Sequence, residues 1–235
     1  MTITYINHSG FFVELDQVCL LFDYWQGSLP EPIPGKTLLV FASHSHMDHY
    51  NPAIFAYAAQ WEQAKVILGN DIRLSARRKE ELQITDEDFL RLGPGRDVTV
   101  WGVRIRTLRS TDKGVAYLVT AEDRNIYHAG DLNWWVWEAD PEPAKAVMTE
   151  NFFAEVEKLK GIPIDAAFLT LDARQQSTAD WGFDYYLQNL DIKKAVPMHS
   201  FGKYETQMDF AVSPKAQPYR EKILLLTQSG MQAEA

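Results

Sequence analysis

Histidine and aspartate side chains gather in one short segment, directly after an apolar run. The segment holds His44, His46, Asp48 and His49. Imidazoles crowded this closely cost free energy when they are charged or unpaired, unless they bind something. Because alternate residues of an extended chain point the same way, His44 and His46 can share one metal ion. Asp48 and His49 begin the following turn and can face a second ion. A histidine-rich surface loop is the alternative interpretation.

The composition limits the groups that can hold such an ion. The chain has 235 residues, six histidines and a single cysteine, Cys19. A thiolate-rich zinc site is therefore excluded, and the ligands must be imidazoles and carboxylates. A lone cysteine cannot form an intramolecular disulfide, which favours a reducing compartment. The first residues lack a basic region followed by a long apolar run, and no stretch is apolar enough to span a membrane. We therefore expect a cytoplasmic protein.

The charge balance bears on the partners. Lysine and arginine number 23 against 32 aspartate and glutamate residues, a formal net charge of −9. Such an acidic chain is not suited to binding extended nucleic acid through general electrostatic attraction. We therefore expect a small-molecule substrate. No heptad seam or symmetric patch predicts an oligomer, so the oligomeric state stays open.

Short runs rich in β-branched and aromatic residues predict strands between turn residues. The predicted strands are Thr2–Ile6, Phe11–Leu15, Val18–Asp23, Lys36–Ala42, Lys65–Leu68, Val98–Trp101, Val103–Leu108, Gly114–Thr120, Asn125–His128, Ile164–Leu171, Lys193–Met198 and Ile223–Thr227. The predicted helices are Ala53–Ala64, Asp71–Leu82, a long helix from Pro141 to about Lys160, and Thr178–Leu190. Strands followed by a helix occur twice, which predicts an α/β protein of the αββα type, a four-layer sandwich of two mixed β-sheets flanked by helices. No linker divides the chain, so residues 1–235 are expected to form a single domain.

The histidine segment resembles a known family. His44-x-His46-x-Asp48-His49 after a buried strand is similar to the H-x-H-x-D-H signature of the metallo-β-lactamase fold superfamily, and the resemblance covers nearly the whole chain. Further matches in chain order are Asp23 at the end of an early strand, Asp131 in a Gly-Asp pair, and His199 in Pro197-Met198-His199.

The resemblance implies a fold and a metal centre. The implied fold is the metallo-β-lactamase fold, and the implied cofactor is one or two divalent ions, Zn, Mn or Fe. The implied metal ligands are His44, His46, Asp48, His49, Asp131 and His199. The first two would hold one ion, Asp131 would bridge, and the others would hold the second ion.

One departure from the family's pattern leaves a gap in the first site. The family normally supplies another histidine before the Gly-Asp pair, but no histidine lies between His49 and His128. The gap can be filled by Asp112, by Ser110, by His128 or by water, or that ion can be bound weakly. An aspartate ligand would favour a harder ion such as Mn²⁺ or Fe²⁺.

Other side chains are expected near the centre. His8, in Asn-His-Ser-Gly, resembles a segment of the family's cytosolic branch that includes ascorbate-6-phosphate lactonases, where it lies beside the metals or faces the substrate. Three tryptophans follow Asp131 closely, and they can line a substrate pocket or belong to the core. Arg174 can hold an anionic group or form a surface ion pair with Asp172.

Together these residues predict a metal-dependent hydrolase that uses a metal-bound hydroxide. A divalent ion lowers the pKa of bound water from ~16 to about 7 and stabilises developing charge. Asp48 is the expected catalytic residue, because it can orient the attacking water or pass a proton to the leaving group. The expected substrate is a small anionic ester, lactone or phosphodiester. The alternative is a non-hydrolytic metal-binding or ligand-sensing protein with one degraded metal site.

Overall fold

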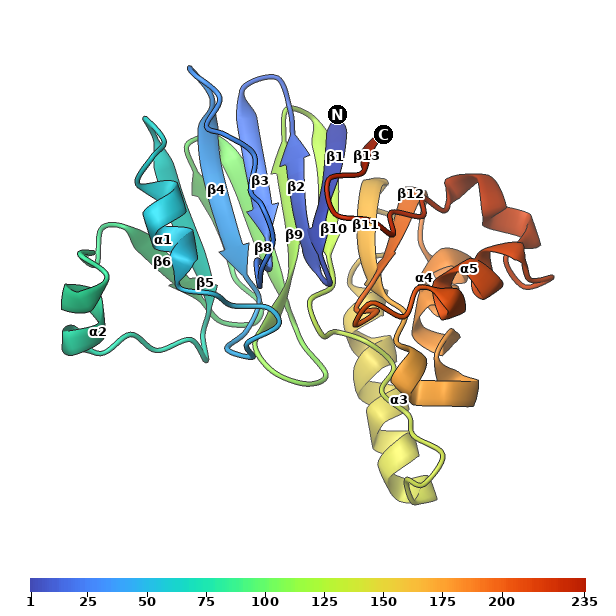
Figure 1. Cartoon of the computed structure of the whole chain (residues 1–235). Helices are drawn as coiled ribbons and strands as arrows, with labels where there is room; N and C mark the ends of the chain where they lie inside the picture. Colours follow the sequence, from blue (N-terminus) through green and yellow to red (C-terminus); the bar gives the residue numbers. More distant parts are fainter.

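Two β-sheets face each other, and helices cover their outer faces (Figure 1). The computed structural model describes residues 1–235. Helices α1 (Ala53–Ala58) and α2 (Ala76–Glu81) lie on the side of the first sheet, whereas α4 (Trp181–Asn189) packs on the second. The predicted αββα sandwich of the metallo-β-lactamase type is thereby confirmed.

Both sheets are mixed. The first has the order β13 (Gln232–Glu234), β1 (Thr2–Asn7), β2 (Gly10–Glu14), β3 (Val18–Phe22), β4 (Thr37–Ala42), β5 (Ala64–Gly69) and β6 (Phe89–Leu92). The second has the order β12 (Ile192–Met198), β11 (Ile164–Thr170), β10 (Arg124–His128), β9 (Val115–Ala121), β8 (Val103–Arg109) and β7 (Asp97–Val100). Strands β3 to β6 run parallel, as do β10 to β12. The carboxyl ends of parallel strands meet at one edge, which is where such folds place their sites.

The sheets share one apolar core. A cluster of 46 buried side chains draws on both sheets, and Phe11, Phe22 and Phe168 stack near its centre. A second cluster of 14 side chains lies between the first sheet and α1. The single-domain organisation stays a prediction, which the shared core supports.

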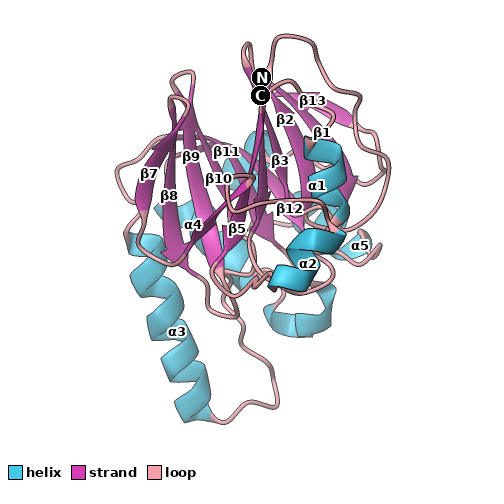
Figure 2. Cartoon of the chain, turned by 90° about the vertical axis from the view of Figure 1, so that its left-hand side faces the viewer, coloured by secondary structure: helices cyan, strands magenta, loops and turns pink.

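The long helix α3 (Glu142–Glu157) projects beyond the sheets (Figure 2). In its last turns Phe152 and Val156 are buried. Its first turns are exposed, including Val147. The helix is therefore held at its C-terminal half only. No helix of the chain combines the length and apolarity that a membrane crossing requires.

Several elements differ from the sequence prediction. Helix α1 ends at Ala58 instead of Ala64, because Ala64 already begins β5. Helix α2 begins late, since Ser75 caps it by accepting a hydrogen bond from the Arg78 amide. The sequence also missed the strands β6 and β13, the helix α5 (Glu205–Val212) and two 3₁₀-helices, Ala173–Thr178 and Gln217–Lys222, and it predicted one wrong strand, Ile223–Thr227. In that segment only Ile223 forms an isolated bridge, and the chain continues to β13 at the edge of the first sheet.

Polar contacts join the two sheets where the histidine segment begins. The Val115 amide donates to the carbonyl of Ser43 (3.1 Å), and the Tyr117 hydroxyl donates to the carbonyl of Ala42 (3.1 Å). Gly114 makes this approach possible: its φ is +66°, and a Cβ there would lie 2.0 Å from the Ser43 oxygen and 2.7 Å from His44 Cβ. Only glycine fits this position.

Replacing Gly114 tests this contact. Gly95 has a similar φ of +70° but open space around it, so Gly95→Ala is a matched control. Left-handed backbone strain should cost either variant about 1–2 kcal/mol. Overlap with Ser43 should cost Gly114→Ala about 1–3 kcal/mol more. Denaturant unfolding followed by circular dichroism measures both losses, and equal losses would contradict the close approach.

Candidate metal centre

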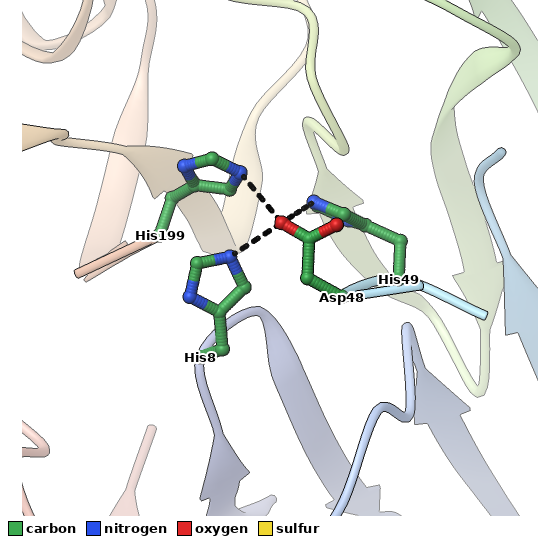
Figure 3. A group of neighbouring side chains, drawn as sticks. All are labelled: His8, Asp48, His49 and His199. Carbon is green, nitrogen blue, oxygen red and sulfur yellow. Dashed lines mark ion pairs between the residues drawn. The ribbon is translucent and has the colours of Figure 1, made fainter. Parts of the chain in front are cut away.

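Four side chains from three separate parts of the chain converge in Figure 3. His8 lies in the turn between β1 and β2, Asp48 and His49 follow β4, and His199 follows β12. Asp48 Oδ2 lies 3.3 Å from His8 Nε2, 3.7 Å from His199 Nε2 and 3.8 Å from His49 Nε2. A group of nitrogen and carboxylate donors this close together can hold a metal ion.

A second group lies beside the first. It consists of His44, His46, Asp112 and Asp131. His44 Nε2 lies 3.0 Å from His46 Nδ1 and 3.4 Å from Asp131 Oδ2. His46 Nδ1 lies 3.5 Å from Asp112 Oδ2. Two imidazoles and two carboxylates thus face one another. The imidazoles follow β4, whereas Asp112 lies in the β8–β9 connection and Asp131 follows β10.

Asp131 faces both groups. While its Oδ2 faces His44, its Oδ1 lies 3.2 Å from His49 Nε2 and 3.3 Å from His199 Nε2. It follows β10, and the preceding Gly130 has a φ of +51°, which turns the chain sharply there. One carboxylate therefore presents one oxygen to each group.

The unpaired atoms of the centre fit a metal ion. Three of its buried polar atoms that face one another lack a hydrogen-bond partner: His49 Nε2, His199 Nε2 and Asp131 Oδ1. Leaving a buried polar atom unpaired normally costs about 1–3 kcal/mol. Several such atoms that point at one another are explained by a cation between them, and the His and Asp donors suit a divalent ion.

Carboxylates orient the histidines from behind. Asp23 Oδ2 accepts from His49 Nδ1 (2.6 Å) and from the Ser43 hydroxyl (2.6 Å), which in turn accepts from His44 Nδ1 (2.9 Å). Asp172 Oδ2 accepts from His199 Nδ1 (2.9 Å). A proton fixed on Nδ1 leaves the lone pair of Nε2 free for a metal.

Charge within the centre shifts its pKa values. Burial disfavours the charged form of His49, but Asp131 and Asp23 outweigh burial and hold the pKa of this imidazole well above its usual value. Burial likewise raises the pKa of Asp131, but His49 and His199 hold it well below its usual value. The cluster therefore favours ionised carboxylates and a charged His49, and a cation that binds there would displace the proton on His49 Nε2.

His8 differs from the other histidines. Its Nδ1 accepts a hydrogen bond from the Phe201 amide (3.3 Å), so in the neutral ring the proton sits on Nε2. Burial lowers the pKa of His8 to about 4, which favours the neutral ring at pH 7. Its Nε2–H then points at Asp48, so His8 is arranged as a donor to that carboxylate.

The structure brings all the expected ligands together. They are His44, His46, Asp48, His49, Asp131 and His199. Of the alternatives for the missing histidine, Asp112 lies in the second group, with His44 and His46. Ser110 Oγ accepts from the Asp112 amide (3.1 Å), and His128 lies behind the centre, within 2.9 Å of the Ser9 carbonyl.

The role of Asp172 was missed from the sequence, which favoured a surface ion pair with Arg174. Arg174 does pair with Asp172, but Asp172 is 1% exposed and also holds His199. Burial raises its pKa, whereas hydrogen bonds from His199 and Arg174 lower it, to about 2. A usable signal was present: Asp172, like Asp23, comes directly after a buried strand.

A cleft of about 650 Å³ opens over the centre. Asp48, Asp131 and His199 form part of its lining, and Trp135, Trp137 and Arg174 lie around them. Of the three tryptophans after Asp131, only Trp134 turns away, to pack against Phe152 and Trp181. The volume is typical of small-molecule sites.

Comparison with known proteins identifies a family model and relatives that resemble the chain. A model described as the beta-lactamase superfamily domain matches residues 2–143, which is more than half of the chain. A UPF0173 metal-dependent hydrolase of Opitutus terrae is 31% identical over 154 residues, which make up 56% of this chain and 63% of that protein. The match thus spans less than two thirds of the relative's length.

Solved structures share the fold. A metallo hydrolase from the archaeon Ignicoccus hospitalis has a TM-score of 0.62 at 18% identity, and the match covers 100% of this chain and 98% of that one. The metallo-beta-lactamase fold protein YhfI from Bacillus subtilis has a TM-score of 0.61 at 14% identity, with 100% and 99% covered. With residues 2–143 matched by the family model and the fold shared throughout, the chain belongs to the beta-lactamase superfamily and has the metallo-β-lactamase fold.

Proposed function

We propose that the protein is a metal-dependent hydrolase with two divalent ions. The observation that carries this proposal is the placement of Asp131, which turns one oxygen toward each of two groups of converging donors. Similarity to proteins named metal-dependent hydrolases supports it. A single carboxylate shared in this way suits two ions acting on one substrate.

The ligands divide into two sets. His44, His46 and Asp112 would hold one ion, and Asp48, His49 and His199 the other, with Asp131 between them. The alternative of a non-hydrolytic protein rested on an incomplete first site, and Asp112 supplies the donor that was missing. A set of two imidazoles and two carboxylates favours Mn²⁺ or Fe²⁺ over Zn²⁺ at that site.

Side chains of the protein would orient the reacting groups and transfer the proton. When bound, the ions supply Lewis acidity, which acidifies a water molecule to serve as the hydroxide nucleophile and polarises the substrate oxygen. Asp48 lines the cleft and is 16% exposed at its side chain, so it can accept a proton from the attacking water and deliver it to the leaving oxygen. His8 would hold Asp48 in place from the opposite side.

The substrate would be a small anionic ester, lactone or phosphodiester. Water adds to its carbonyl or phosphoryl centre, the bond to the leaving oxygen breaks, and that oxygen takes up the proton. The cleft volume of about 650 Å³ admits a small molecule. The guanidinium of Arg174 on the cleft wall suits an anionic group.

Metal removal and Asp48→Ala test the reaction. Protein dialysed against a chelator should lose hydrolysis of aryl ester, lactone and bis-aryl phosphate probes, and Mn²⁺, Zn²⁺ or Fe²⁺ should restore it.

Asp48→Ala should lower kcat by at least about 10²-fold, because the proton acceptor is lost. Circular dichroism checks the fold, and the exposed Asp16→Ala is the control. Metal-dependent turnover near the wild-type rate in Asp48→Ala would refute the assignment.

Metal content tests Asp112. Wild-type protein prepared without chelators should carry two equivalents of metal, and Asp112→Ala should carry one. Asp112→His should regain the second equivalent with a stronger preference for Zn²⁺. The neighbouring exposed Lys113→Ala is the matched control. Elemental analysis by mass spectrometry decides, and two tightly held equivalents in Asp112→Ala would exclude this ligand.

Asp172→Ala tests the support behind His199. Loss of a carboxylate that orients a ligating histidine should weaken metal affinity about 10–100-fold. Asp165→Ala is the matched control: Asp165 is also buried and ion-paired, but it begins β11, whereas Asp172 follows the end of that strand. Metal titration by calorimetry should separate the variants, and an equal affinity in both would show that Asp172 does not act through His199.

A further inference from the structure

The cleft has an aromatic wall beside the metal centre. Trp135 and Trp137 form it, and Met148 of α3 lies at its edge. The indole rings of Trp135 and Trp137 are nearly parallel, with an interplanar angle of 9° and centroids 6.1 Å apart. Trp135 is buried at 9% exposed, so within this stacked pair Trp137 offers most of the apolar surface to the cleft.

Trp135 fixes this wall to the metal centre. Its indole Nε1 donates to the backbone carbonyl of Asp131 (2.9 Å), and its ring lies 5.7 Å from the ring of His199. The polar edge of the indole is thus satisfied inside the protein. The wall begins where the two proposed metal sites meet.

Packing does not account for the exposure of Trp137. Its side chain is 36% exposed, although Trp134, three residues earlier, is packed among Phe152, Phe153 and Tyr185. An exposed tryptophan that is ordered against a second tryptophan is typical of a binding surface.

Two further apolar side chains that line the cleft are exposed. Met47 is 73% exposed although it lies within the histidine segment, and Phe201 is 40% exposed beside His199. Methionine side chains are flexible and adapt to flat ligands.

One cation lines the cleft. Arg174 donates from Nε and Nη2 to Asp172, and its guanidinium carbon lies 4.4 Å from the ring centroid of Phe201. Nη1 makes no hydrogen bond within the chain and remains available. Because Asp172 holds His199, Arg174 is fixed at the metal end of the cleft.

We propose that the substrates are small anions that carry a flat aromatic group. The anionic, scissile group would lie at the metals beside Arg174, and the aromatic ring would lie against Trp137, which Trp135 supports. This substrate class rests on the proposed hydrolase function and narrows it: the ring supplies affinity through the wall, whereas the anionic group sets the reacting bond.

Two phosphonate probes test the wall without turnover. Phenylphosphonate and methylphosphonate share the anionic group, contain no hydrolysable ester and differ in the ring. Metal-loaded protein should bind phenylphosphonate at least about 10-fold more tightly in calorimetry, since stacking adds to apolar burial. Trp137→Ala should remove most of that preference and leave methylphosphonate binding unchanged. Trp101→Ala, another exposed tryptophan on the β7–β8 turn, should change neither.

The outcomes separate the substrate class from the reaction. Equal binding of the two probes, no binding of either, or a Trp137→Ala effect that is the same for both would overturn the aromatic wall. Arg174→Gln should weaken both probes by a similar factor. Loss of hydrolysis in the ester and phosphodiester panel, with the phenyl preference intact, would instead overturn the proposed reaction and leave the ligand class in place.

Discussion

The rest of the structure depends on the electrostatic interaction between the buried carboxylate of Asp131 and the histidines around it. A charge in this position is expensive to bury, and only surrounding imidazoles and cations offset the cost. His44, His49 and His199 approach it from two sides. Each of these histidines is fixed in turn by Asp23, Ser43 or Asp172. The interactions around Asp131 therefore involve loops of both sheets.

The order and direction of the strands bring these charged side chains together. Parallel strands deliver Asp23 after β3, the histidine segment after β4, Asp131 after β10 and His199 after β12 to the same edge. The contact of Ser43 with Val115 then fixes how closely the two sheets approach there. Site geometry is therefore a property of strand packing more than of any one loop.

Sequence reasoning reached the local features and missed those that depend on tertiary contacts. The His44–His49 spacing is encoded in adjacent residues, so the segment and the strand before it were predictable. The sequence left Asp112 as one of several candidates to fill the gap, and only the tertiary contact between the β8–β9 connection and the histidine segment places it beside His46. Helix α5 and the edge strand β13 have weak patterns of their own and are formed by packing against the larger sheets. The difference between partly buried Trp134, which packs against Phe152 of α3, and exposed Trp137 also depends on where α3 lies.

Because α3 projects from the sheets, the cleft residues that it carries are separate from the residues of the proposed metal centre. The proposed metal donors lie in segments that follow strands of the shared core. Ala144 and Met148 of the cleft lie in the half of α3 that extends into solvent and contributes little to that core. Substitutions there can alter the choice of ligand while the metal donors stay in place. Evolution can thus diversify specificity in this scaffold without rebuilding its chemistry.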